Sequence, residues 1–423
     1  MRAVEQLQGA PVPASALERL VLPSRVAGYA PPMLDELTAS GEVVWAGAGA
    51  LPGKDGWIAL HPADAAPLLL PPPHPLELTP VHRAVLDALS GGYGLFFRQI
   101  AEQVRAAGHE VADAALAEAV WDLAWSGRLT NDTLGPLRAL LGSGRTAGAT
   151  AHRARRTAPR GRWAGSTARP AVSRGGPPTV AGRWSLLPDR EADPTLRAHA
   201  LARTLLDRHG VVTRGAVAAE GVEGGFAAAY RVLSAFEESG QARRGYVVEG
   251  LGAAQFAMDG AVDRLRAIST AAERGAVGAG PGAGTGPQAL VLAATDPANA
   301  FGAALPWPDA PPAAETGGAG HKPGRKAGAL VTLVNGRLTL YLERGGRTLL
   351  AWPADDAPAE GARPDAALRA AAEALARAAR DGALGTLTVE RVNGAPVLTD
   401  PFWSGLLEAA GFHATPRGLR LRP

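Results

Sequence analysis

The chain has 423 residues, of which 46% are hydrophobic and 20% charged, so it is long enough for several globular domains. It contains no cysteine, which excludes a disulfide scaffold, a cysteine nucleophile and a zinc site built on thiolates. No apolar run approaches the length of a membrane span and no signal peptide opens the sequence, which predicts a soluble cytoplasmic protein without a membrane partner.

Three segments share one order of predicted elements, in which short helices precede two strands joined by a turn. In the second segment, Thr79 and Pro80 provide a helix cap followed by proline at the first helical position. In the third, a long helix at 226–236 precedes strands at 245–248 and 254–258. This order is typical of winged-helix domains. We therefore predict three of them, at residues 1–76, 77–142 and 183–272.

The positive charge is concentrated in one tract. The formal net charge is +3, yet residues 143–183 contain nine arginines and no acidic residue, so the remainder of the chain is net negative. The tract has no hydrophobic periodicity, which predicts a disordered linker over 143–182. Arginines bind nucleic-acid phosphates, and Trp163 and Trp184 could stack on unpaired bases. The predicted contacts of the tract are Arg153, Arg155, Arg156, Arg160, Arg162 and Trp163.

The charge of the winged-helix domains themselves is less favourable for binding nucleic-acid phosphates. The outward faces of the longer helices in the second and third domains carry acidic residues, which repel phosphate. We therefore interpret these domains as packing or docking units rather than as readers of the major groove. Arg243 and Arg244, at the foot of the third wing, are the predicted phosphate contacts there.

A second linker, residues 273–287, is almost entirely glycine and alanine and precedes a β-rich region at 288–423. Asn-Gly pairs at 335–336 and 393–394 predict two hairpins, and a helical pattern follows at 364–380. The predicted fold class is therefore α+β and multidomain, with tandem winged-helix domains followed by a β-barrel-like domain that has a covering helix.

The last domain also contains candidate binding residues. Residues 292–308 combine a strand with Asp296, Asn299 and Trp307, which suggests a surface that guides a nucleic-acid strand. The arginines predicted to hold phosphates on it are Arg344, Arg347, Arg417, Arg420 and Arg422. In the alternative interpretation, Trp307 packs at the end of the barrel and Asp296 caps a turn.

No catalytic constellation can be assigned from the residues. The segment 48–55 approaches a phosphate-binding loop, but it lacks the first glycine and has Asp55 where the magnesium-binding hydroxyl belongs. The nine histidines are scattered, which disfavours a metal site. We therefore predict no cofactor for this chain and assign no catalytic residue.

Several long stretches resemble one protein family. They are Gln6–Leu22, Trp45–Leu60, Trp121–Leu141, Gly182–Pro188, Leu292–Pro308, Gly328–Trp352 and Ala410–Pro423. The amino-acid sequences of these stretches are similar to the C-terminal region of the bacterial large helicase-related (Lhr family) superfamily 2 ATP-dependent DNA helicases. The resemblance runs over nearly the whole chain. It implies a role in DNA repair, and the winged-helix and barrel part is also similar to AlkZ-like DNA glycosylases.

The resemblance does not imply helicase activity for this chain, because the motor motifs of the family are missing from its sequence. The family uses ATP and magnesium in two RecA-like motor domains, and no such motor motif is present here. Gln6-Leu7-Gln8 fits the Gln-x-Gln string of the glycosylases, although its place before the first wing is unlike a pocket lining.

Three functions therefore stay open: a nucleic-acid-binding accessory module of the repair helicase, a base-flipping glycosylase acting on uracil or alkylated bases, and an oligomerisation module with weak DNA contact. The expected partners are DNA, chiefly single-stranded, or a DNA/RNA hybrid, together with the helicase core and further copies of the chain. The expected location is the nucleoid.

Overall fold

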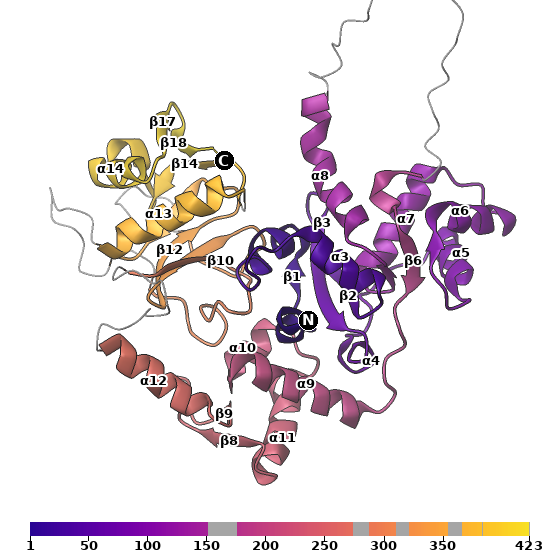
Figure 1. The fold of residues 1–423 in the computed structure, drawn as a ribbon, viewed down its shortest axis with the longest axis horizontal. Helices are drawn as coiled ribbons and strands as arrows, with labels where there is room; N and C mark the ends of the chain where they lie inside the picture. The colour runs from indigo at the N-terminus through magenta and orange to yellow at the C-terminus, as the bar shows by residue number, and fades with distance from the viewer. Residues whose placement is uncertain (151–175, 274–286, 310–320, 354–365, 383, 423) are drawn as a thin grey trace, which may run out of the picture. The chain divides into compact units, whose positions relative to one another are not determined.

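The computed structural model describes residues 1–150, 176–273, 287–309, 321–353, 366–382 and 384–422 (Figure 1). The chain forms two compact units. The first consists of Met1–Ser15 and Tyr29–Ala192, and the second of Ala16–Gly28 and Asp193–Pro423. Among the described helices, none has the length and apolar character needed to cross a membrane.

The first unit begins with a winged helix whose sheet has the strand order β1-β3-β2. The sequence predicts wing strands at 43–45 and 57–61 around a wide glycine-rich turn at 47–56. The two strands are longer, because most of residues 47–56 extend the hairpin. Glycine is required in these strands: a Cβ at Gly47 would lie 2.0 Å from the Ala124 carbonyl oxygen. The elements are α1 (Arg2–Leu7), β1 (Val12–Pro13), α2 (Ala14–Ala16), α3 (Pro31–Ala39), β2 (Val43–Leu51), β3 (Asp55–Pro62) and α4 (Ala66–Leu69).

The second winged helix follows in the same unit, and its predicted cap is confirmed: the Thr79 hydroxyl accepts a hydrogen bond from the His82 amide. Its sheet has the order β4-β6-β5. The elements are α5 (Pro80–Leu89), β4 (Leu95–Phe96), α6 (Phe97–Ala106), α7 (Asp113–Trp125), β5 (Leu129–Asn131), α8 (Gly135–Thr150), the short 3-10 helix η2 (Pro178–Val180) and β6 (Arg183–Leu186).

The arginine-rich tract is therefore placed differently from the prediction. Strand β6, which we had assigned to the third winged helix, pairs with β4 and β5 of the second. The tract thus connects two neighbouring strands of one wing, and it does not separate two domains. Helix α8 extends to Thr150, and Val180 near the other end of the tract is fully buried. Residues 151–175, with Arg153, Arg155, Arg156, Arg160, Arg162 and Trp163, lie outside the described residues.

Four tryptophans form the shared core of these two winged helices. The ring centroids of Trp45, Trp121, Trp125 and Trp184 lie 5.1–6.4 Å apart in four contacting pairs. Trp184 is fully buried, and its indole N–H donates to the Val180 carbonyl. The prediction that Trp184 stacks on unpaired bases is therefore wrong, because its ring stabilises the core.

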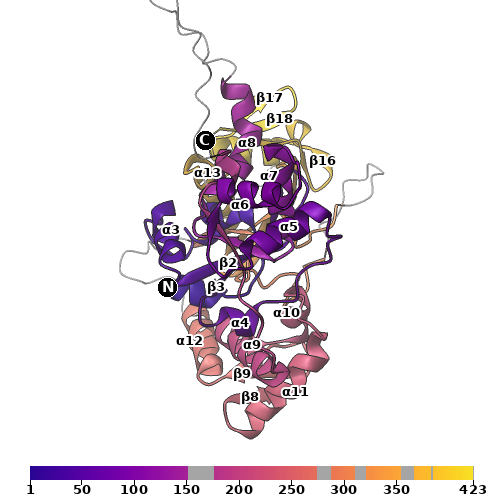
Figure 2. The same cartoon turned by 90° about the vertical axis from the view of Figure 1, so that its right-hand side faces the viewer.

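The second unit contains the third winged helix, whose sheet has the order β7-β9-β8. Its strands β8 and β9 are labelled near α11 in Figure 2. The predicted long helix is confirmed as α11, with Leu233 and Phe236 in the core. The first wing strand ends at Gly245, three residues before the predicted end, because the Gln255 amide hydrogen-bonds both backbone groups of Val248 and closes a loop there. The elements are α9 (Pro194–His209), β7 (Val211–Val212), α10 (Arg214–Ala219), α11 (Gly225–Glu238), β8 (Ala242–Gly245), β9 (Gln255–Met258) and α12 (Ala261–Glu273).

The C-terminal domain of the second unit has two sheets. The larger has the order β10-β11-β12-β13-β15-β16 and the smaller β14-β18-β17. The strands are β10 (Ala289–Ala293), β11 (Leu330–Val334), β12 (Arg337–Leu342), β13 (Thr348–Ala351), β14 (Leu387–Val389), β15 (Arg391–Val392), β16 (Ala395–Pro396), β17 (His413–Thr415) and β18 (Gly418–Leu421). Both Asn-Gly hairpins are confirmed, with positive φ at Asn335 and Asn393.

The C-terminal core lies between the sheets and two helices. The predicted covering helix is confirmed as α13 (Ala366–Arg380), whose Leu368 and Leu375 are buried with Leu340 and Leu349 of the larger sheet (Figure 1). The helix α14 (Pro401–Ala409) and the 3-10 turn η3 (Val397–Thr399) complete the domain. Among the described strands, β10 and β16 are the edges of an open sheet, so the barrel-like form of this domain is not confirmed.

Candidate nucleic-acid interface

Three of the predicted arginines, Arg347, Arg417 and Arg420, line one groove of about 540 Å³ on the C-terminal domain. We call it the arginine groove. Its remaining lining combines small, hydroxyl-bearing and acidic residues from turns and strands: Gly345, Thr386, Thr388, Glu390, Thr415 and Pro416. Residues separated by some 70 positions in the sequence are thereby brought together on one surface.

Two tight turns position the arginines. The turn between β12 and β13 carries Arg347, and the Arg347 carbonyl accepts a hydrogen bond from the Glu390 amide at 2.8 Å. The turn between β17 and β18 carries Arg417 and is closed by the Thr415 hydroxyl, which donates to the Gly418 carbonyl at 2.7 Å. Gly418 has a φ of 147°, and a Cβ there would lie 2.2 Å from the Val389 carbonyl oxygen. Only glycine allows this turn to approach β14 so closely.

The electrostatics of the arginine groove favour an anion. Three guanidinium groups face a single carboxylate, and the 3.6 Å ion pair between Arg347 and Glu390 is weak, because the Arg347 side chain is 72% exposed. Nε of Arg420 is buried and finds no hydrogen-bond acceptor among the described residues. A buried donor without a partner costs about 1–3 kcal/mol.

The other arginines predicted for this domain lie elsewhere. Arg344 is exposed, but it does not line the groove, and its side chain packs over Gly328. Arg422 is exposed near the end of the described residues. Trp307 is half-buried, rests on Gly302, and meets the Tyr341 ring edge-on at 5.6 Å. The structure therefore gives Trp307 the packing role that we had weighed as the alternative.

Asp296 also differs from the predicted surface residue. It is fully buried, and the Arg25 guanidinium donates to its two carboxylate oxygens at 2.6 and 3.0 Å. The buried Asn299 amide and the Arg325 guanidinium hold the same loop through its backbone carbonyls. Burial lowers the pKa of Arg325, which the nearby carboxylates of Asp296 and Glu220 oppose. These contacts make the loop a fixed part of the fold.

In the third winged helix, the two predicted arginines have partners within the domain. Arg244 is 3.2 Å from the Glu237 carboxylate and donates to the Tyr230 hydroxyl. The Arg243 side chain is 82% exposed and lies 3.6 Å from Asp259. Arg243 is therefore the more accessible of the pair, whereas Arg244 stabilises the wing against α11.

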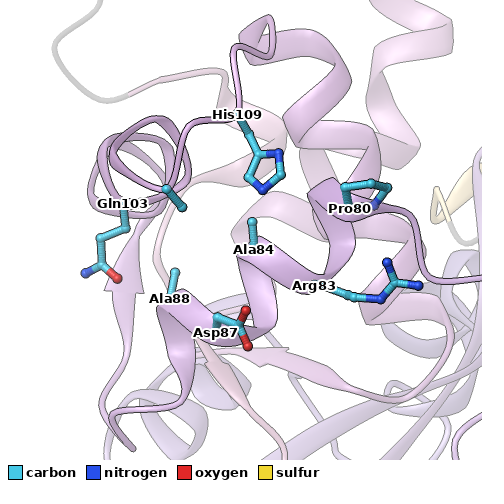
Figure 3. A pocket seen from close by; sticks show the side chains of 8 residues that line it. Pro80, Arg83, Ala84, Asp87, Ala88, Gln103 and His109 are labelled. Atoms are coloured by element: carbon cyan, nitrogen blue, oxygen red, sulfur yellow. The ribbon is translucent and has the colours of Figure 1, made fainter.

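A second cavity, of about 400 Å³, lies on the second winged helix (Figure 3). Arg83 and Asp87 extend from α5 beside the small side chains of Ala84 and Ala88, and the imidazole of His109 faces them from the loop after α6. A guanidinium and a carboxylate on the same helix give the cavity no net charge preference, so it favours phosphate less than the arginine groove does.

Sequence reasoning missed two clusters of buried charge. One is the pair of Arg25 and Asp296. The other joins Glu220, at the end of α10, to Arg208 and His209, at the end of α9. Both Arg25 and Glu220 lie next to glycine-containing loops, where no hydrophobic periodicity marks a residue as buried. Their only sequence signal is a charged residue close to a predicted helix end.

Known proteins resemble this chain over nearly its whole length. Family models for winged-helix domains of the large helicase-related protein match residues 1–63 and 191–277. The chain is 49% identical to the Lhr helicase/probable uracil glycosylase of Mycolicibacterium smegmatis and 39% identical to the Lhr helicase/uracil glycosylase of Escherichia coli. Each match covers 99% of this chain and 26% of the relative. The chain thus spans about a quarter of the length of these relatives.

A solved structure, the Streptomyces sahachiroi DNA glycosylase AlkZ, is similar over 90% of this chain and 91% of its own, with a TM-score of 0.37 and 14% identity. The family models and the two relatives confirm the resemblance seen in the sequence: the chain carries winged-helix domains of the large helicase-related (Lhr) family and matches Lhr helicases along almost its entire length.

Proposed function

We propose that this chain is a nucleic-acid-binding accessory region of an Lhr-type DNA-repair helicase, with the helicase core as its partner. Its ligand is single-stranded DNA or a DNA/RNA hybrid. The observation that carries the proposal is the arginine groove, which brings Arg347, Arg417 and Arg420 together on one concave surface beside a single carboxylate, that of Glu390. Guanidinium groups on a concave surface bind phosphate oxygens without requiring a particular base sequence.

The test is the double variant Arg347→Gln/Arg417→Gln, which removes two exposed charges and leaves the partly buried Arg420 in place. Each phosphate contact to a single strand contributes about 0.7 to the slope of log K against log salt, so we expect this slope to fall by about 1.4. Fluorescence anisotropy of a labelled oligothymidylate, titrated at several salt concentrations, measures it.

The matched control is Arg369→Gln/Arg377→Gln, which removes two exposed arginines from α13, away from the arginine groove. It changes the net charge by the same amount and should leave the slope nearly unchanged. Equal slopes for both double variants would contradict a phosphate-binding role for the groove.

We further propose that the chain alone hydrolyses no ATP and needs no metal. Lys54 lies in the tight turn between β2 and β3 with a φ of 66°, whereas a phosphate-binding loop joins a strand to a helix whose N-terminus faces the nucleotide. We expect ATP turnover at background level with and without single-stranded DNA. Turnover that copurifies with the chain and disappears in Lys54→Ala would contradict this.

A uracil-DNA glycosylase is the second candidate function, because the names of both curated relatives include uracil glycosylase. Such an enzyme would flip a base into a pocket and assist cleavage of its C–N bond. Asp296 is a poor candidate for the catalytic group, since both of its oxygens accept hydrogen bonds from Arg25. The test is release of uracil from a single-stranded oligonucleotide by the purified chain, detected as alkali-labile strand breaks.

A further inference from the structure

The second winged helix exposes a phenylalanine ring beside an arginine, and it exposes a tyrosine three residues earlier in the sequence. The side chains of Tyr93 and Phe96 are 62% and 50% exposed. Phe96 of β4 is the cross-strand partner of Arg183 of β6, and the guanidinium carbon of Arg183 lies 5.5 Å from the centroid of the Phe96 ring. We call these three residues the aromatic platform. They are separate from the arginine groove, which belongs to the other compact unit.

The fold of the domain does not explain the exposed ring of Phe96. Its neighbours Leu95 and Phe97 are buried and fill the core below the strand. Phe96 also occupies the N-cap position of α6, where serine, threonine, aspartate or asparagine would accept a hydrogen bond from the first turn. A phenylalanine side chain cannot do so. The Gln99 side chain still accepts a hydrogen bond from the Phe96 N–H at 2.8 Å, but the Phe96 ring caps no backbone group of the first turn. The exposed apolar surface of this ring is a cost that a ligand-binding role would justify.

Arg183 is held in place but stays accessible. Its backbone N–H donates to the Asp132 carboxylate at 2.8 Å, and its Nε lies 3.9 Å from the same carboxylate. The Arg183 side chain is nevertheless 60% exposed. A Cβ at Gly94 would lie 3.1 Å from that of Arg183, so the small residue allows the two strands to approach closely. The guanidinium is thus positioned over the Phe96 ring with donors left for a phosphate.

Apart from Asp132, the sequence segments that form the platform carry no acidic residue. No acidic residue occurs between Ser90 and Ala101 or between Gly176 and Leu187. Arg183 is also the first residue of β6, directly after the arginine-rich connection from β5.

We propose that the aromatic platform stacks unpaired bases of a single-stranded nucleic acid, with Arg183 binding an adjacent phosphate. The inference rests on the nucleic-acid binding proposed above. Aromatic faces stack on any base, but a base inside a duplex is already covered on both faces by its neighbours. The platform would therefore give the chain its preference for unpaired strands, whereas the arginine groove holds the backbone.

The test compares two ligands of equal length and charge: an oligothymidylate and the same strand with every base replaced by an abasic tetrahydrofuran unit. In the full chain, Tyr93→Leu/Phe96→Leu removes both rings and keeps apolar side chains. Because stacking on each ring changes affinity by about fivefold or more, we expect at least about tenfold weaker binding of the oligothymidylate and at most about a twofold change for the abasic strand.

The matched control is Tyr246→Leu, which removes an aromatic side chain that is 82% exposed in the loop between β8 and β9. It should bind both strands like the wild type, and Phe96→Tyr with Tyr93 intact should retain stacking. Circular-dichroism melting verifies that each variant is folded.

The other possible results of this experiment each contradict a different part of the proposal. Unchanged oligothymidylate affinity in the double variant would overturn the platform alone. Unchanged affinity together with an altered sedimentation coefficient would assign the rings to a contact between proteins. Equal losses on both strands would show a backbone effect instead of stacking. If the wild-type chain bound neither strand, both the platform and the proposed function would be overturned.

Discussion

Arg25→Ala is expected to lower the free energy of unfolding of the second unit by about 3–5 kcal/mol, because it leaves the buried carboxylate of Asp296 without its partner. The Asp296 side chain has no solvent exposure, and that of Arg25 is 11% exposed, so solvent screens this ion pair little. The pair also joins the loop after η1 (Leu17–Val21) to the loop after β10, which fixes the segment Ala16–Gly28 in its unit.

Urea unfolding, monitored by hydrogen exchange in peptides from β10–β13, measures the loss of unfolding free energy in the second unit alone. The matched control is Arg105→Ala, which breaks an ion pair of the same 2.6 Å length to Asp113. Since those two side chains are 49% and 57% exposed, the control should cost less than about 1 kcal/mol, read from peptides of α6 and α7. A cost for Arg25→Ala no larger than that of the control would contradict the role assigned to this pair.

Glu220→Gln is expected to produce the second large effect, and one that depends on pH. The Glu220 side chain is 13% exposed. Burial raises its pKa, but the hydrogen bond with His209 and the charge of Arg208 outweigh burial and lower the pKa from 4.5 to about 2. The carboxylate therefore contributes stability that is fully present above about pH 4.5 and is lost as the pH falls toward 2.

The size of this contribution follows from the shift. One pKa unit corresponds to about 1.4 kcal/mol, so a shift from 4.5 to about 2 is worth on the order of 3 kcal/mol at pH 7. We expect Glu220→Gln to lose roughly that amount at neutral pH and to approach the wild type near pH 2. Glu373→Gln, at a residue of α13 whose side chain is 59% exposed, provides the control and should change little at any pH.

Urea denaturation between pH 2 and 7, with hydrogen exchange in peptides from α9 and α10, measures the difference between each variant and the wild type. A stability difference for Glu220→Gln that stays constant across this range would show that the carboxylate does not titrate as the cluster with Arg208 and His209 predicts.

The two proposed binding surfaces share one structural property. The arginine groove keeps a buried Nε of Arg420 without an acceptor among the described residues, and the aromatic platform exposes Phe96 at a helix N-cap. In each case, a local preference of folded proteins is violated on a basic surface. The proposed roles of the two surfaces differ: the arginine groove would bind phosphates, and the aromatic platform would stack on unpaired bases.

The sequence by itself determined the elements whose signals are local. The Asn-Gly pairs fixed both C-terminal hairpins, because asparagine and glycine adopt the positive φ that these turns require. Thr79 and Pro80 fixed the start of α5, and apolar spacing fixed α11 and α13. The sequence pattern also placed Arg347, Arg417 and Arg420 on turns and a strand of the last domain. It did not predict that the three residues line one groove.

Only the tertiary structure decided the contacts between distant segments. Arg25 and Asp296 are 271 positions apart, and β6 returns across the arginine-rich tract to pair with β4 and β5. Trp184 looks like a solvent-facing residue among arginines, yet it lies in the core of four tryptophans. Local preferences are set by a residue and its neighbours within about one helical turn or one β-turn, whereas strand pairing and burial are decided by which complementary surfaces the whole chain can bring together.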